Sequence, residues 1–283
     1  MLDLRAGAGC LRIPILYLSV QGPGMKAYQD ILVEERAGIV NLTLNRPDAL
    51  NAMRTRTLEE MLDVLDHVRD STSARVLVIT GAGRAFSSGA DLAAGDGNGD
   101  LGYKVEHYYN PILEKLMALP VPVLTVVNGP AVGAGCALAL AGDIVLATTS
   151  AYFLQAFINI GLVPDAGSTW LLPRLMGRAR AQAMMMLGDR VSAQQAEAWG
   201  MIYEVVEGVS LNDRAEALAQ RLANGPTKAY ALIRQGVRYA LDHSLTEALA
   251  AESRSQRLAG ASEDFAEGVA AFKEKRRAVF RGR

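Results

Sequence analysis

Apolar positions along this 283-residue chain alternate between strand-like and helix-like spacing. Residues 39–44 alternate between apolar and polar, which predicts a half-buried strand ended by the turn at 45–47. A helix is predicted next, because apolar residues recur at helical spacing at Leu58, Met61, Leu62, Leu65 and Val68. The continuous apolar run 76–79, closed by Gly81-Ala82-Gly83, predicts a strand buried on both faces.

The same order of elements then recurs. Residues 123–127 predict a second buried strand, and Gly133-Ala134-Gly135 opens an apolar helix that we expect to run over 136–141. A third strand is expected at 143–147. Strands that alternate with helices through short glycine turns indicate an α/β fold with parallel strands.

The pattern changes after Ser192. A capping-box pattern at Ser192-x-x-Gln195 predicts a short helix, and 201–206 predicts one more strand. Beyond residue 212 we expect only helices. The expected organisation is therefore an N-terminal extension of uncertain order at 1–24, a core at 25–211 and a C-terminal helical region at 212–283.

Composition narrows the class of protein. Half of the residues are hydrophobic, 21% are charged and the net charge is −1, so neither nucleic acid nor an anionic membrane is an expected partner. The apolar run 11–20 contains Arg12 and Pro14 and is too short to span a membrane. Two cysteines and three scattered histidines predict a reducing, cytoplasmic protein without a metal site.

Candidate chemistry gathers at Asp165 and at two glycine-rich turns. Asp165 lies in an apolar turn before a predicted helix, so it is either a helix cap or an acid-base group. The turns at 87–92 and 133–135 each follow a predicted strand. They are either simple tight turns or, if their backbone N–H groups converge, an oxyanion hole.

Several motifs occur in an order that resembles the crotonase superfamily, the enoyl-CoA hydratases and isomerases, over residues 28–280. These motifs are Asn45-Arg46-Pro47, Arg84 to Leu92, Asn128 to Gly135, Gly142-Asp143-Ile144, Gly161 to Thr169 with Leu172-Pro173-Arg174, and Glu267 to Arg276. The resemblance implies an α/β crotonase-like spiral of ββα units. It also implies a C-terminal helical region that assembles a homotrimer or a dimer of trimers.

The resemblance further implies an acyl-CoA substrate and no separate cofactor, since coenzyme A is part of the substrate. In such proteins two backbone N–H groups hold the thioester oxygen, and these correspond to Ala90 and Ala134. The remaining substrate contacts would come from Asp48, Ala49, Asn51, Ala52, Ser88, Gly89, Asp91, Leu92, Gly133 and Phe157, with Lys275 reaching the phosphates from a neighbouring subunit.

The departures from the family pattern favour an isomerase. Family hydratases use two glutamates, whose positions correspond here to Ala137 and Phe157, and neither side chain can transfer a proton. Asp165 remains as a single proton shuttle. We expect its apolar neighbours Phe157, Leu162 and Val163 to raise its pKa. The segment 161–174 further resembles the ring-epoxide isomerases of phenylacetate degradation.

The predicted reaction is therefore a shift of 3-enoyl-CoA to 2-enoyl-CoA, as in fatty-acid metabolism, or of 1,2-epoxyphenylacetyl-CoA to oxepin-CoA. Three alternatives stay open at this point. They are an enoyl-CoA hydratase, an arylacyl-CoA dehalogenase with Asp165 as nucleophile and His107 as the candidate base, and a binding protein without catalysis. Residues 93–109 are expected to shape the acyl pocket.

Overall fold

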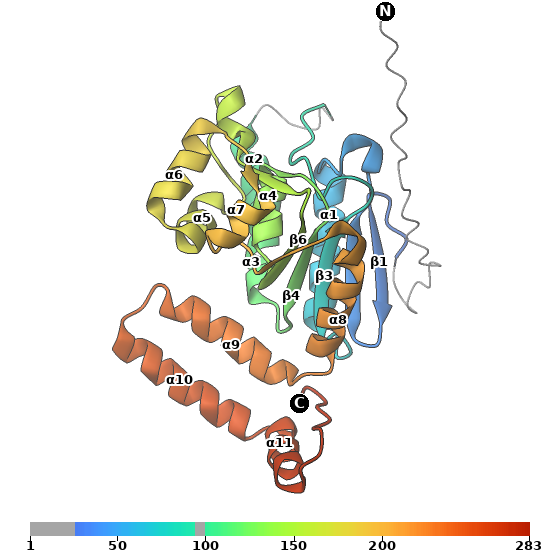
Figure 1. Cartoon of the computed structure of the whole chain (residues 1–283), viewed down its shortest axis with the longest axis vertical. Coiled ribbons are helices and arrows are strands. Elements are labelled where there is room, and N and C mark those ends of the chain that lie inside the picture. The colour runs from blue at the N-terminus through green and yellow to red at the C-terminus, as the bar shows by residue number, and fades with distance from the viewer. Residues whose placement is uncertain (1–25, 94–99) are drawn as a thin grey trace, which may run out of the picture.

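The computed structural model describes residues 26–93 and 100–283, which form two sheets surrounded by helices (Figure 1). The predicted extension at 1–24 lies outside the described residues. The larger sheet contains, in spatial order, β1 (Ile31–Arg36), β2 (Ile39–Leu44), β3 (Val76–Gly81), β4 (Val123–Val127), β6 (Ile144–Thr148) and β9 (Glu204–Val206). The smaller sheet contains β5 (Ala131–Val132), β7 (Tyr152–Leu154) and β8 (Val191–Ser192).

Helices account for most of the remaining chain. Those of the core are α1 (Thr55–Asp70), α2 (Leu101–Lys104), α3 (Asn110–Ala118), α4 (Ala134–Leu140), α5 (Ser168–Met176), α6 (Arg178–Leu187) and α7 (Ala193–Ala198). The C-terminal helices are α8 (Leu211–Ala223), α9 (Thr227–Ala240), α10 (Leu245–Gly260) and α11 (Glu263–Glu274). Short turns of 3-10 helix lie at η1 (Pro47–Ala49), η3 (Ala156–Ile160) and η4 (Gly208–Ser210), and η2 (Val105–Tyr109) is a π-helix.

The predicted α/β fold with parallel strands is confirmed, with two antiparallel exceptions, β1 at the edge of the larger sheet and the pair β7–β8 in the smaller one. Strands β2, β3, β4, β6 and β9 run parallel, whereas β1 pairs antiparallel with β2. The hydrophobic pattern missed β1 because three apolar residues are followed there by three charged ones, without alternation. In the structure Ile31 and Val33 are buried, while Leu32 between them is half exposed.

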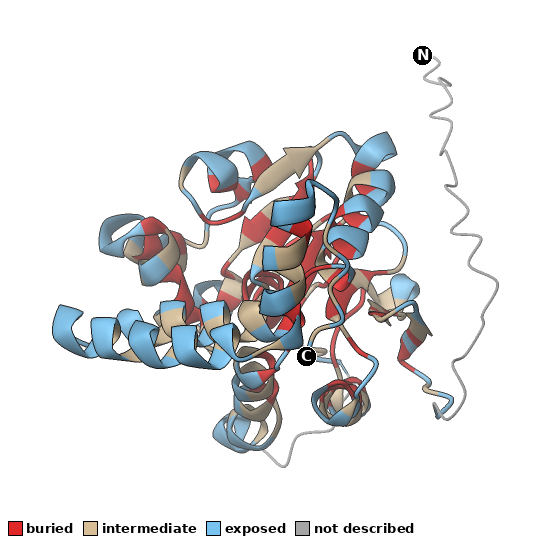
Figure 2. Ribbon diagram, turned by 90° about the horizontal axis from the view of Figure 1, so that it is seen from below, coloured by how far each residue is buried: buried red, intermediate tan, exposed pale blue. Residues whose placement is uncertain are grey.

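The two faces of the larger sheet are covered by different helices. Residues of α8, among them Leu211 and Leu218, pack on Val76, Leu124 and Leu146 of one face. The opposite face shares a larger core with α1, α3, α4 and α5. Figure 2 shows buried residues concentrated between these layers. The strands β3 and β4 were predicted as buried apolar runs, and burial on both faces explains that pattern.

The C-terminal region departs from expectation at its end. The chain leaves the last helix at Lys275, which has a φ of 54°, so residues 275–283 are not helical. The carboxylate of Asp264 accepts hydrogen bonds from the N–H groups of Arg281 and Gly282, at 2.6 and 2.8 Å, and holds this tail against α11. Helices α9 and α10 lie beside each other and extend away from the sheet (Figure 1).

Apolar side chains on α9 and α10 remain exposed within this chain. Those more than half exposed are Ile233, Val237, Leu241, Leu245, Leu249 and Leu258. An apolar face of this kind normally packs against another surface. None of the helices in the described part of the chain has the length and apolar character needed to cross a membrane.

Close backbone packing at Gly129 yields a stability prediction. A Cβ at Gly129 would lie 2.2 Å from the carbonyl oxygen of Arg84, which belongs to the adjacent backbone and cannot rotate away. We therefore expect Gly129→Ala to lower the free energy of unfolding by about 1–3 kcal/mol, measured by urea denaturation.

The matched control is Gly236→Ala, because a Cβ at Gly236 in α9 would meet nothing within 4 Å. Alanine favours a helix interior over glycine by about 0.5–1 kcal/mol, so this variant should unfold at a slightly higher urea concentration than the wild type. Equal destabilisation by both substitutions would contradict the close packing at Gly129.

Candidate active site

The first glycine-rich turn is held in place by the segment that follows the strand β2. The N–H of Ser88 donates to the carbonyl of Leu50 at 2.9 Å, and the N–H of Met53 donates to the carbonyl of Gly89 at 2.8 Å. Asp91 N–H then donates to the carbonyl of Met53 at 3.0 Å. Residues 50–53 and 88–91 therefore run side by side, joined by backbone hydrogen bonds.

The second turn packs directly on the first. The N–H of Val132 donates to the carbonyl of Ser87 at 2.9 Å. A Cβ at Gly135 would lie 2.7 Å from that same carbonyl oxygen, and a Cβ at Gly89 would lie 2.7 Å from the carbonyl oxygen of Val132. Only glycine permits this approach at either position. The structure thus brings together the two turns that the sequence analysis singled out.

Two backbone N–H groups at this junction are available to a ligand. Ala134 is the first residue of α4, and its N–H points away from the intrahelical acceptors, as at any helix start. Ala90 lies beside Met53 in an isolated β-bridge. Within the part of the chain that the structure describes, neither N–H has a hydrogen-bond acceptor. Both can therefore donate to a substrate oxygen.

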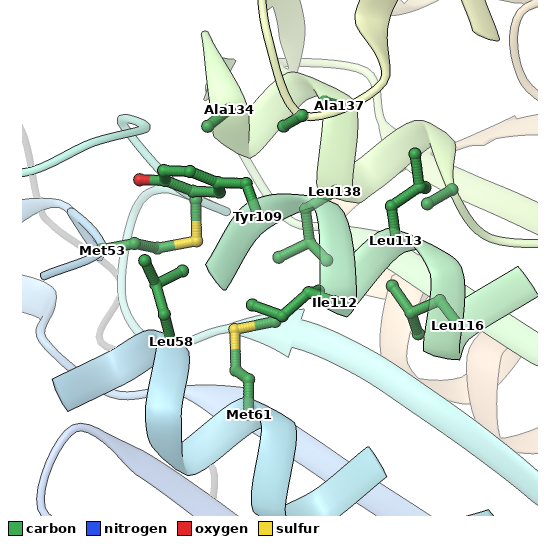
Figure 3. A pocket seen from close by; sticks show the side chains of 12 residues that line it. Met53, Leu58, Met61, Tyr109, Ile112, Leu113, Leu116, Ala134, Ala137 and Leu138 are labelled. Atoms are coloured by element: carbon green, nitrogen blue, oxygen red, sulfur yellow. The ribbon is translucent and has the colours of Figure 1, made fainter. Parts of the chain in front are cut away.

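An apolar pocket begins at Ala134 and extends between α1, α3 and α4 (Figure 3). Aliphatic, methionine and alanine side chains line it, with a single tyrosine. The lining residues are Met53, Leu58, Met61, Tyr109, Ile112, Leu113, Leu116, Ala134, Ala137, Leu138, Ala141 and Ala166. Such a pocket suits a hydrophobic acyl group.

Most of these lining residues were missed as site residues. The helical spacing of Leu58 and Met61 predicted them to face the core, and nothing in the spacing distinguished a core contact from a pocket wall. Helix α3 was not predicted, since the sequence analysis left residues 110–118 unassigned. The expectation that 93–109 shape the acyl pocket is met at Tyr109, whereas 94–99 lie outside the described residues.

Asp165 directly precedes the pocket-lining residue Ala166 in the chain. Its Oδ1 atom is buried without a hydrogen-bond partner among the described residues. Burial raises the pKa of the Asp165 carboxyl to about 6, and a hydrogen bond from its own backbone N–H only partly opposes this effect. A carboxylate with a pKa near neutrality can both accept and return a proton.

The helix-cap interpretation of Asp165 is not supported by the structure. Helix α5 is preceded by Gly167, and no side chain caps it. Asp165 contributes only its backbone, because its carbonyl accepts a hydrogen bond from Ser168 N–H at 2.9 Å. Its carboxylate is therefore free of a capping role.

The two positions that the family resemblance matches to the hydratase glutamates lie beside the pocket and the second glycine-rich turn. Ala137 is 1% exposed and lines the pocket. Phe157 is also buried, and its ring lies against Gly133, where a Cβ would be 3.7 Å from the ring edge. Gly133 itself has a φ of 56°, which favours glycine at this turn. The site therefore has no proton-transfer group at either position.

Other predicted contact residues serve the scaffold in this chain. Asn51 is 1% exposed, and its side chain bonds the backbone of Arg46, Ala82 and Ala85 at 2.8–2.9 Å. Its side chain is thus occupied by the backbone, and a contact of Asn51 with the substrate stays a prediction. The Asp91 carboxylate likewise pairs with Arg46 at 2.8 Å.

The remaining predicted contacts differ in exposure. Asp48 and Leu92 are exposed, Ala49 and Ser88 are half-buried, and Ala52 is buried. Ser88 Oγ donates to the carbonyl of Ala49 at 3.3 Å. Lys275 is exposed at the end of α11, far from α4 in this chain, so its predicted contact requires a neighbouring subunit (Figure 1).

A second, polar groove of about 930 Å³, open to solvent, adjoins the first turn. The sequence analysis did not assign its arginines to the site. Its lining residues are Arg46, Arg54, Thr55, Arg56, Glu59, Asp91 and Ala93. Arg54 forms two hydrogen bonds with Asp30, at 2.6 and 2.7 Å, and these lower the pKa of that carboxyl against the opposing effect of burial.

His107, the candidate base of the dehalogenase hypothesis, is exposed on η2 and stacks on Tyr103 with ring centres 3.9 Å apart. It is not part of the pocket wall. Among the described residues, no group of three histidine, cysteine, aspartate or glutamate side chains is arranged to hold a metal ion.

Comparison with known proteins agrees with this geometry. Residues 34–283 match the family described as enoyl-CoA hydratase/isomerase. The chain belongs to this family. The 1,2-epoxyphenylacetyl-CoA isomerase of Escherichia coli K12 is 46% identical over 258 residues, covering 89% of this chain and 98% of that protein. A Rhodobacter capsulatus protein, described as a "probable enoyl-CoA hydratase", is 43% identical and covers 91% and 100%.

Solved structures of the enoyl-CoA hydratase/isomerase family share the fold. The crystal structure of enoyl-CoA hydratase from Bacillus anthracis has a TM-score of 0.86 and 32% identity, covering 90% of this chain and 100% of that one. The resemblance to the crotonase superfamily that the motifs carried is therefore confirmed. The fold is the α/β crotonase fold, with mixed sheets and C-terminal helices.

The burial of Asp165 yields a pH-dependent stability prediction. Its folded-state pKa of about 6 lies above the ordinary value of 3.8, so the ionised carboxylate opposes folding, increasingly as the pH rises from about 4 through 6. We expect Asp165→Asn to raise the free energy of unfolding at pH 8. A difference of about two pKa units sets an upper limit of about 3 kcal/mol, which solvent contact of the part-exposed carboxylate reduces.

Urea denaturation at pH 4 and pH 8 checks this expectation, because the gain should shrink toward pH 4. Asp189→Asn is the matched control, since Asp189 is exposed beyond the end of α6. The same gain at both pH values in the Asp165 variant would show that its charge is not the cause.

Proposed function

We propose that this family member is an acyl-CoA isomerase in which Asp165 moves a proton between two carbon atoms of a bound thioester. One observation carries the proposal. Asp165, which precedes the pocket-lining residue Ala166 in the chain, has a pKa raised to about 6, while alanine and phenylalanine stand at positions 137 and 157. Hydration needs two proton-transfer groups, whereas a shift of a double bond needs one.

The proposed reaction begins with the thioester oxygen bound to the N–H groups of Ala90 and Ala134. Asp165, ionised above pH 6, removes a proton from the carbon next to the thioester carbonyl. The negative charge then moves to the thioester oxygen, where each aligned donor contributes about 3–4 kcal/mol of stabilisation. Asp165 returns the same proton to a carbon further along the acyl group, and the double bond shifts.

The substrate class that we propose is an aromatic epoxide or a 3-enoyl chain attached to coenzyme A. The apolar wall of the pocket supports a hydrophobic acyl group. The 46% identity to a 1,2-epoxyphenylacetyl-CoA isomerase supports the aromatic epoxide. With no charged side chain in that wall, the pocket offers no partner for a charged acyl terminus.

A hydratase is the second candidate, because the Rhodobacter capsulatus relative carries that description at 43% identity. The alanine at position 137 weighs against it. The dehalogenase hypothesis loses support, because His107 is exposed and stacked on Tyr103 outside the pocket wall. A binding protein without catalysis would not need the buried, proton-accepting carboxylate of Asp165.

We also propose that α9, α10 and α11 pack against neighbouring copies of the chain in a trimer or a dimer of trimers. The exposed apolar residues of α9 and α10 support this arrangement. In such an assembly Lys275 of one subunit would approach the phosphates of coenzyme A bound to another. Light scattering coupled to gel filtration should give a mass about three or six times the 30.3 kDa of one chain.

A double substitution tests that assembly, because Ile233→Glu with Val237→Glu places charges on the exposed apolar face of α9. The variant should dissociate into smaller species and keep the circular dichroism of the folded wild type. A wild-type mass of 30.3 kDa would contradict the proposal.

The proposed role of Asp165 predicts a loss of turnover without a loss of binding. Asp165→Asn should lower kcat about 10²–10⁴-fold for 1,2-epoxyphenylacetyl-CoA and for a 3-enoyl-CoA, because asparagine cannot accept the proton. The dissociation constant of a CoA ester should change little. In the wild type, kcat/KM should fall as the pH drops below about 6, the pKa of the Asp165 carboxyl.

Absorbance assays of double-bond position measure the turnover, and Asp189→Asn serves as the control that should retain full activity. Rapid hydration of crotonyl-CoA by the wild type would instead favour the hydratase. Full isomerase activity of Asp165→Asn would exclude Asp165 as the proton shuttle.

A further inference from the structure

Among the described residues that line the apolar pocket, only Tyr109 has a polar side chain. It is 5% exposed. The other lining residues are aliphatic, methionine or alanine, so none of their side chains can form a strong hydrogen bond with the acyl group. In ligand sites, a few polar groups within an apolar wall fix orientation and provide specificity.

Tyr109 also occupies an unusual backbone position. It ends the π-helix η2, whose wider turn is closed by a hydrogen bond from Asn110 N–H to the carbonyl of Val105. Single π-helical turns are uncommon and occur often at functional sites. Its neighbour Tyr108 differs, since its hydroxyl donates to Glu59 at 3.5 Å outside the pocket wall.

The ring of Tyr109 lies toward the thioester end of the pocket. Figure 3 shows the ring between Met53 and Ala134, with the hydroxyl directed away from Leu113 and Leu116. Ala134 carries one of the two available N–H groups, and Met53 is bridged to Ala90, which carries the other. The hydroxyl therefore faces the acyl atoms nearest the thioester carbonyl rather than the far end of the chain.

We infer that Tyr109 is a specificity-determining residue that donates a hydrogen bond to an oxygen atom on the acyl group, a few bonds from the thioester carbonyl. The preferred substrate class is an oxygenated aromatic acyl-CoA, such as the ring epoxide, over a plain 3-enoyl chain. This inference rests on the proposed function. Tyr109 only holds the oxygen, while Asp165 moves the proton between carbons. In the ring epoxide the carbon–carbon bond shared by the two rings also breaks as the oxepin forms, so no atom is gained or lost.

Tyr109→Phe removes the hydroxyl and keeps the ring that packs in the pocket. We expect kcat/KM for 1,2-epoxyphenylacetyl-CoA to fall about 10–100-fold, whereas the value for 3-hexenoyl-CoA stays within about threefold of the wild type. Tyr108→Phe is the matched control from the same π-helix, and both rates should be unchanged. An equal loss on both substrates in Tyr109→Phe would overturn the inference.

A binding measurement makes the test independent of turnover. The probes are phenylacetyl-CoA and 2-hydroxyphenylacetyl-CoA, which differ by one ring oxygen, and calorimetry gives their dissociation constants. The wild type should bind the hydroxylated ester at least about fivefold more tightly, and Tyr109→Phe should lose that preference. A preference that persists in Tyr109→Phe, or that the wild type lacks, would overturn the inference. If the wild type isomerises neither substrate, the proposed function fails, and the binding preference alone decides the role of Tyr109.

Discussion

The close contact between two glycine-rich turns is the constraint on which the site depends. A Cβ at either Gly89 or Gly135 would lie 2.7 Å from a backbone carbonyl of the other turn. Because no side chain separates the turns, the N–H groups of Ala90 and Ala134 emerge near one another at the start of the apolar pocket. The strands β3 and β5 that lead into the turns pair with parallel neighbours, and most of their residues are buried.

The same packing creates the electrostatic conditions for proton transfer. Apolar side chains line the pocket, and burial raises the pKa of Asp165 to about 6. An exposed carboxylate would be a weak base, whereas the Asp165 carboxyl is poised near neutrality. Burial destabilises the ionised carboxylate of Asp165 and so lowers the free energy of unfolding. The same burial brings its pKa close to neutrality, where the group can exchange a proton.

The structure also assigns scaffold roles to side chains that the sequence analysis grouped with the substrate contacts. Asn51 and Asp91 belong to motifs that adjoin the expected coenzyme A contacts, yet the Asn51 amide bonds the backbone and Asp91 pairs with Arg46. These residues position the turns rather than offer their side chains to a ligand. Tyr109 shows the reverse case, because it lies in a segment without a readable pattern and yet provides the polar group of the pocket wall.

The sequence by itself determined most of the strands, the two glycine turns and the isolated carboxylate at Asp165. Hydrophobic periodicity and the glycines that tight turns require are local properties of the chain. It also showed that positions 137 and 157 carry no proton-transfer group. Only the tertiary structure decided that Asp165 caps no helix, that Tyr109 faces the pocket with Leu58 and Met61, and that the two turns touch. Pocket walls and pKa shifts arise from contacts between residues distant in sequence, and no local pattern specifies those contacts.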